Sequence, residues 1–125
     1  MNAISEKHLL DGTIAYFKFS KGAKPEDFLG VFPEFQEMVN DPHVDKMIVD
    51  VQTDHVWGQA IQDVWLQTGL EAESAGIRRW AVVTGEQSKK MTIRHLVQGG
   101  RNRDRTYEWY VSDDFDDVLR WIRRE

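Results

Sequence analysis

Two short apolar segments constrain the fold of this chain more than any other feature. Residues 46–51 (KMIVDV) and 79–84 (RWAVVT) are nearly continuous in apolar side chains, as expected of strands that are covered on both faces. Each is followed by a segment with helical character, residues 57–75 and residues 88–97. Because strands that alternate with such helices pair in parallel through right-handed crossovers, the sequence predicts an α/β protein with a mostly parallel sheet.

The N-terminal segment adds a hairpin to this sheet. Two strands, residues 3–10 and 13–20, are joined by Asp11-Gly12, a dipeptide that tolerates positive φ at both turn positions. Side chains alternate in the second strand, so we expect Ile14 and Tyr16 on one face and Ala15, Phe17 and Phe19 on the other. The hairpin makes the predicted sheet mixed.

The first predicted helix spans residues 24–40, with Pro25 at its start. Its apolar stripe consists of Phe28, Phe32, Phe35 and Val39. Pro33 disturbs this helix, because proline removes a backbone hydrogen bond and clashes with the preceding turn. We therefore expect either a kink at Pro33 or a second helix that starts near it.

The remaining signals complete a single α/β domain over residues 1–125. Gly76 ends the helix that begins near residue 57, and Asp113 is the predicted N-cap of a C-terminal helix over residues 113–124. A strand over residues 106–111 precedes that helix. The predicted order is β-β-α-β-α-β-α-β-α, and a chain of 125 residues fits one domain of this kind.

Composition excludes several functional classes. The net charge of -5 argues against nucleic acid and against anionic membrane surfaces, because both attract basic proteins. The absence of cysteine excludes disulfides, thiol catalysis and thiolate metal sites, and it is typical of a cytoplasmic protein. We find no signal peptide, no transmembrane segment and no histidine pattern typical of a metal site, and we predict no cofactor.

This pattern resembles the STAS-like fold between Gly12 and Trp121. The resemblance depends on the hairpin, the aromatic first helix, the segments IVDV and WAVVTGE, and a last helix that ends in LRWI. The family includes the bacterial anti-sigma-factor antagonists and small bacterial and archaeal relatives that have been likened to CRAL-TRIO lipid carriers. The resemblance implies a regulatory module that binds a protein partner or an apolar ligand.

One departure from the family concerns the loop after IVDV. In the antagonists this loop carries an Asp-Ser motif whose serine is phosphorylated, and the phosphate switches partner binding. Residues 53–58 here read TDHVWG, without a serine, and Thr53 stands before Asp54 rather than after it. A phospho-regulated antagonist that acts through Thr53 is therefore an alternative hypothesis.

Asp50, Asp54 and His55 form the most interesting polar group in the sequence. A carboxylate at the end of a strand could orient His55 as a general base, which would suit a hydrolase. Alternatively, Asp54 caps the following helix and His55 is an ordinary residue of its first turn. No G-x-S-x-G nucleophile motif accompanies the group, so the simpler capping role is preferred.

The aromatic residues suggest a groove between the first two helices. Its candidate lining is Phe28, Phe32, Thr53, Trp57, Ile61 and Trp65. Such a groove would accept an apolar ligand or a partner helix. The same helical spacing also suits ordinary core packing, so both interpretations of these aromatic residues stay open.

Three arginines form a second, weaker candidate site. Arg101, Arg103 and Arg105 lie beside two glycines and could bind an anion, or they could simply balance an acidic chain. We also consider a homodimer formed through exposed aromatic surface. The first hypothesis is thus a non-catalytic binding or regulatory module that uses the aromatic groove near residues 52–58.

Overall fold

Five strands form one sheet in the computed structural model, which describes residues 4–19, 27, 30–51, 59–84 and 107–124. The strands lie side by side in chain order: β1 (Ile4–Leu10), β2 (Ile14–Phe19), β3 (Lys46–Asp50), β4 (Arg79–Val83) and β5 (Glu108–Ser112). β1 is antiparallel to β2, and the other neighbouring pairs are parallel. The predicted mixed, mostly parallel sheet is confirmed.

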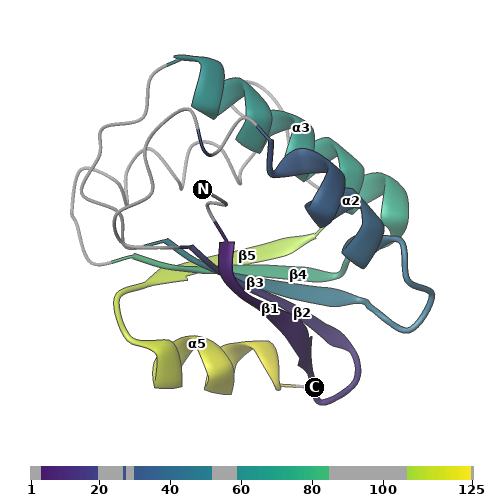
Figure 1. Ribbon diagram of the computed structural model, residues 1–125. Coiled ribbons are helices and arrows are strands. Elements are labelled where there is room, and N and C mark those ends of the chain that lie inside the picture. The colour runs from purple at the N-terminus through teal and green to yellow at the C-terminus, as the bar shows by residue number, and fades with distance from the viewer. Residues whose placement is uncertain (1–3, 20–26, 28–29, 52–58, 85–106, 125) are drawn as a thin grey trace.

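Helices cover both faces of this sheet. α2 (Phe32–Val39) and α3 (Gln59–Ala75) lie on one face, and α5 (Phe115–Ile122) lies on the other (Figure 1). The helix predicted for residues 88–97 falls outside the described residues, so the complete predicted order stays a prediction. None of the helices in the described part of the chain is long and apolar enough to cross a membrane.

The first hairpin turns at Asp11-Gly12. Both residues have positive φ, 55° and 76°, and the Thr13 N–H donates to the Leu10 carbonyl oxygen at 3.2 Å. Positive φ at both central positions is the geometry of the type I′ turn, whose twist matches that of the flanking strands. The predicted hairpin is confirmed.

Strand β2 divides the interior into two cores. Phe17 and Phe19 belong to the larger core under α2 and α3, whereas Ile14 and Tyr16 belong to the smaller core under α5. This division follows from the two-residue period of a strand, which sends neighbouring side chains to opposite faces. The predicted faces of the strand are confirmed.

A proline lies at the start of α2, and a glycine follows the end of α3. α2 begins at Phe32 with Pro33 in its first turn, where the missing N–H has no helical partner in any case. A helix start near Pro33 is thus shown, whereas the helix predicted before it falls mostly outside the described residues. α3 ends at Ala75, and the next residue, Gly76, has a φ of 84° and donates its N–H to the Glu73 carbonyl oxygen at 3.2 Å, so the predicted stop is confirmed.

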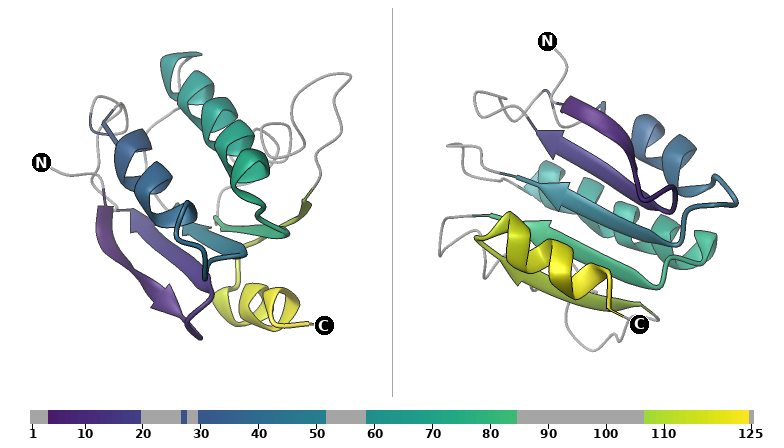
Figure 2. Two further views of the ribbon diagram at one scale, coloured as in Figure 1. Left: turned by 90° about the vertical axis from the view of Figure 1, so that its right-hand side faces the viewer. Right: turned by 90° about the horizontal axis from the view of Figure 1, so that it is seen from below.

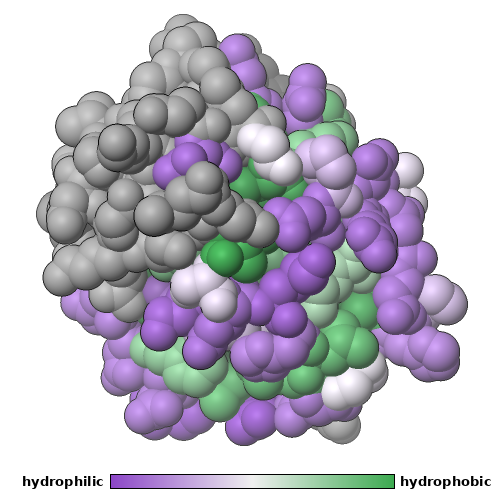
Figure 3. Space-filling view, in the orientation of Figure 1, coloured by the Kyte–Doolittle hydropathy of each residue, from purple (hydrophilic) through white to green (hydrophobic). Residues whose placement is uncertain are grey.

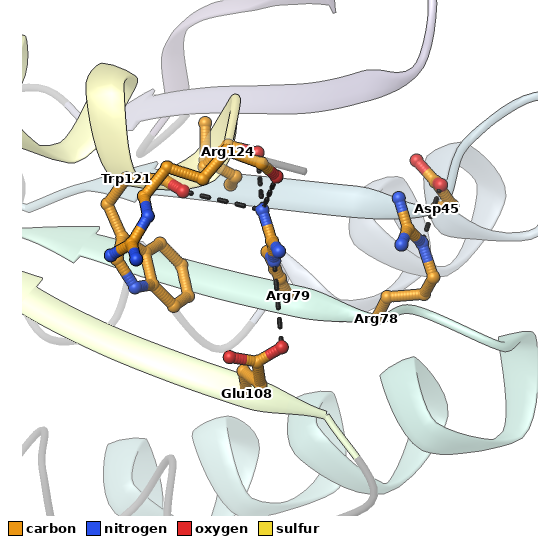
Figure 4. Close-up of polar contacts among 7 residues, drawn as sticks. Asp45, Arg78, Arg79, Glu108, Trp121 and Arg124 are labelled. Atoms are coloured by element: carbon orange, nitrogen blue, oxygen red, sulfur yellow. Dashed lines mark hydrogen bonds and ion pairs between the residues drawn. The ribbon is translucent and has the colours of Figure 1, made fainter.

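Arg79 fastens the C-terminal end of α5 to the sheet (Figure 4). Its Nη1 donates to the carbonyl oxygens of Trp121 and Ile122, each at 3.4 Å, and to that of Arg124. The guanidinium also lies 5.8 Å from the centre of the Trp121 ring and 3.7 Å from a Glu108 carboxylate oxygen. One side chain of β4 therefore donates to three carbonyl oxygens at and just beyond the C-terminal end of α5, where helix carbonyls are short of partners.

The predicted N-cap of α5 is wrong by one residue. Asp114, not Asp113, occupies the cap, and its Oδ1 accepts a hydrogen bond from the Asp116 N–H at 3.0 Å. The backbone of Asp114 is extended, as an N-cap requires, and its N–H donates to Ser112 Oγ at 3.2 Å. Asp113 and Asp114 have the same side-chain chemistry for capping. Asp114 is the cap in the structure, and its backbone N–H is bonded to Ser112 at the end of β5.

Candidate functional site

The carboxyl ends of the four parallel strands meet at one edge of the sheet (Figure 2). In open α/β sheets, ligands usually bind at this edge. Strand alternation sends its described residues to two faces: Phe19, Val51 and Thr84 toward α2 and α3, and Lys18, Asp50 and Ser112 toward α5. The ionisable side chains among these residues therefore lie on the α5 face.

Trp65 connects α3 to this edge. Its side chain is only 5% exposed, and its ring lies 5.5 Å from Phe19 in an edge-on arrangement and 6.5 Å from Trp80. Phe19 and Trp80 stand on β2 and β4, so the indole spans the central strands. Trp65, predicted as either groove lining or core, is part of the buried core.

Two polar atoms of this layer, among the described residues, are buried without a hydrogen-bond partner. They are Trp80 Nε1 and Thr84 Oγ1, and their residues are 1% and 0% exposed. Thr68 in α3 is also buried, but its hydroxyl donates to the Val64 carbonyl oxygen at 2.8 Å. Unpaired buried donors are uncommon in folded proteins, so these two atoms distinguish the layer under α3.

The α5 face carries a buried tyrosine–carboxylate pair. Tyr16 lies near Asp50, and burial together with the Asp50 charge raises the pKa of Tyr16 from 10.0 to about 12. The Tyr16 ring also packs 5.0 Å from His8 and 5.6 Å from Phe115. Asp50 thus lies on the α5 face, near a buried phenol.

A second carboxylate, near the start of α5, accepts hydrogen bonds from two side chains. Asp117 Oδ2 accepts hydrogen bonds from the Tyr110 hydroxyl at 2.7 Å and from Ser112 Oγ at 2.9 Å. These bonds lower the pKa of Asp117, and the bond to Asp117 raises the pKa of Tyr110. The Tyr110 ring stacks on Trp121 at 5.2 Å. This network fixes the corner between β5 and α5.

The predicted site residues are only partly within the described chain. Asp50 and Trp65 are buried, and Phe32 is half-buried and packs against the larger core. Outside the described residues lie Phe28, Thr53, Asp54, His55, Trp57, Arg101, Arg103 and Arg105. Ile61 lies in α3, but its side chain is not described. The groove, the hydrolase group and the anion site therefore stay predictions.

Two features of the edge were missed from the sequence. Thr84 is the polar residue at the end of the apolar segment WAVVT, and we assigned it no role from the sequence. The pair of Tyr16 and Asp50 requires the register between β2 and β3, in which Lys18 lies beside Asp50. Within the described residues, no group of three metal-ligating side chains is present.

Comparison with protein-family models, curated proteins and solved structures gives no match to this chain. The STAS-like resemblance consequently stays a prediction, and the functional argument depends on the geometry of the chain itself.

Proposed function

We propose that this chain is a non-catalytic, STAS-like binding or regulatory module. It recognises a protein partner or a small apolar ligand at the carboxyl edge of the sheet, on the side of α3, where the aromatic groove near residues 52–58 is predicted. The antiparallel hairpin followed by parallel strands, with α2 and α3 on one face and α5 on the other, supports the STAS-like part of the proposal.

The main support for the proposal is that apolar residues lie on one face of this edge and carboxylates lie on the other. Under α3, Phe19 and Val51 are buried apolar residues of the larger core, and Trp65 packs against Phe19. The described carboxylates of the edge and its corner are on the other face, where Asp50 lies near Tyr16 and Asp117 accepts a hydrogen bond from Tyr110. An apolar surface with neutral donors is suited to recognition rather than to acid–base chemistry.

The hydrolase alternative gains no support from the described residues. It requires His55 to work with Asp50 or Asp54, but Asp50 is buried near Tyr16 on the α5 face. Ser112, a hydroxyl at the same edge, donates to a carboxylate that also binds Tyr110. The alternative of phosphorylation at Thr53 concerns a residue outside the described chain.

A site-specific crosslinker tests where the chain binds. p-Benzoylphenylalanine at Gln62, a half-buried position in α3, should give a discrete adduct after irradiation in the native host. The same crosslinker at Arg120, an exposed position on α5, is the matched control. The mass of the adduct separates a small molecule from a protein partner.

The outcomes of this experiment are distinct. An adduct at position 62 and none at position 120 supports the proposal. An adduct at position 120 alone contradicts the proposed location, and no adduct at either position contradicts the binding role. A homodimer would give an adduct of twice the chain mass.

Figure 3 shows mainly hydrophilic described residues on the face that it presents, with small apolar patches between them.

A further inference from the structure

β1 forms one edge of the sheet and, with seven residues, is the longest of the described strands (Figure 2). Among the described strands it pairs with β2 alone, so its other side has no neighbouring strand in this part of the chain. The side chains of residues 5–9 are exposed. A strand edge without a neighbour accepts another extended chain unless the fold protects it.

The usual protection of a strand edge is weak in β1. Proteins commonly protect such an edge with a lysine or with a bulge. The pairing of β1 with β2 shifts register between Ile4 and Glu6, and residues 6–10 are regular. Lys7 is the lysine of this strand, but its Nζ lies 3.6 Å from Glu34 Oε1 on α2. Because this ion pair offsets the charge of Lys7, the regular part of the edge has little electrostatic protection.

A groove of about 210 Å³ lies between β1 and α2. Lys7 and Leu9 point to the face that α2 covers, because their partners in β2 belong to the larger core. The opposite wall comes from one side of α2 and the turn after it, where positions three and four apart lie together. The lining consists of Lys7, Leu9, Glu34, Glu37, Met38 and Asp41. The groove therefore lies beside the edge of β1.

The groove combines apolar with acidic side chains. Leu9 is 40% exposed, and Met38 is half-buried against the larger core. The other lining residues are three carboxylates and one ammonium. The His43 N–H donates to Asp41 Oδ1 at 2.9 Å, and this bond, with a second contact from the imidazole, lowers the pKa of Asp41, which is therefore charged at neutral pH. Basic and apolar side chains complement such a lining.

We propose that β1 accepts an extended segment of a partner protein as an additional strand, and that this segment turns basic side chains and an apolar one toward α2. In this mode of recognition the backbone hydrogen bonds give affinity and alternate side chains give specificity. The apolar side chain packs against Leu9, and lysines or arginines reach Glu37 and Asp41. An added strand lies about 4.8 Å from β1, which is within the length of these side chains. This surface is additional to the groove of the proposed function, so the two proposals are tested separately.

Three short peptides test this chemistry on the whole chain. The basic peptide TKTVTKT and the acidic peptide TETVTET each place the valine and both charges on one face of an extended strand. The third is the basic peptide with its central amides N-methylated. In an amide NMR titration, the basic peptide should shift the resonances of residues 6–10 and should bind about tenfold more tightly than the acidic one, since two exposed ion pairs contribute about that factor. The N-methylated peptide should not bind, because it cannot donate the hydrogen bonds of a strand.

Two pairs of variants locate the contact. Glu37→Lys and Asp116→Lys each reverse one exposed carboxylate, on α2 and on α5, and change the net charge equally. Glu37→Lys should weaken binding of the basic peptide about fivefold, and Asp116→Lys should leave it within about twofold. Leu9→Ala should also weaken binding, whereas Leu70→Ala, which truncates a side chain of similar exposure on α3, should not.

The outcomes of these titrations are distinct. Shifts confined to β1, with loss of binding on N-methylation and weaker binding in Glu37→Lys, support the proposal. Equal binding of the basic and acidic peptides, or equal effects of Glu37→Lys and Asp116→Lys, would show nonspecific attraction and overturn it. Undiminished binding of the N-methylated peptide, shifts away from β1, or no binding at millimolar peptide would reject strand addition. Resonances of β1 that move on dilution without peptide would identify a second copy of the chain as the occupant and reject the partner segment.

Discussion

Arg123 at the end of α5 forms a two-pronged ion pair with Asp11 in the first hairpin turn. Nε donates to Oδ2 at 2.7 Å and Nη2 to Oδ1 at 3.0 Å, across 112 positions of sequence. The pair connects the turn between β1 and β2 to the helix that covers the smaller core. It lowers the pKa of Asp11 and raises that of Arg123.

Removal of either partner should lower the thermal unfolding midpoint. Asp11→Asn is the suitable partner variant, because asparagine tolerates the positive φ of 55° and only the charge is lost. With Arg123→Ala it forms a double-mutant cycle, in which the double variant should lose less than the sum of the single losses. Both side chains are partly exposed, so high salt should reduce the coupling. Additive losses at low salt would show that the pair contributes nothing.

Phe35→Ala should strongly destabilise the larger core. Phe35 is 2% exposed and its ring lies 5.7 Å from Phe17 across the interface between α2 and the sheet. Truncation of a buried phenylalanine typically costs about 3–5 kcal/mol. Leu9→Ala is the control, because Leu9 is 40% exposed and its loss should change the unfolding free energy by about 0.5 kcal/mol or less. Urea denaturation measures both, and similar values would contradict this assignment of the core.

Local periodicity predicted the described elements well because each depends on neighbouring residues. The two faces of β2, with Tyr16 opposite Phe17, follow from the strand period alone. Gly76 ends α3 because it adopts a positive φ that other residues avoid. The Asp11-Gly12 turn was predictable for the same reason.

Long-range partners could not be predicted in this way. Arg79 reaches the carbonyls of α5 from a strand more than forty positions away, and its sequence neighbours give no indication of this. The proximity of Tyr16 and Asp50 depends on the register of two parallel strands, which the crossover between them decides. The candidate site residues were mostly loop residues, where periodicity provides no information about position.

Tyr16 should titrate far later than an ordinary tyrosine. Burial and the neighbouring Asp50 raise its pKa from 10.0 to about 12, so the folded state holds the phenolic proton more tightly than the unfolded state. Its contribution to stability is complete below pH 10.0 and is lost as the pH rises toward about 12. The ultraviolet absorbance of phenolate measures this transition, and Tyr16→Phe should remove it.

Asp50→Asn provides the control for this titration. It removes the neighbouring charge while burial persists, so the pKa of Tyr16 should fall only part of the way back. An unchanged late transition in Tyr16→Phe would assign the transition to another tyrosine and contradict the prediction.

The network at Asp117 should make the protein sensitive to acid. Hydrogen bonds from Tyr110 and Ser112 lower the pKa of Asp117 below 3.8, so the folded state binds this proton more weakly than the unfolded state. The resulting stability is present above pH 3.8 and is lost as the pH falls through the lower, folded-state value. Urea midpoints measured between about pH 2 and 6 should therefore fall less steeply on the acid side in Asp117→Asn than in the wild type.

Ser112→Ala, which removes one of the two donors, should give an intermediate slope, whereas Asp116→Asn, an exposed neighbour, should retain the wild-type slope. Equal acid slopes in the wild type and Asp117→Asn would show that other carboxylates govern the acid unfolding of this fold.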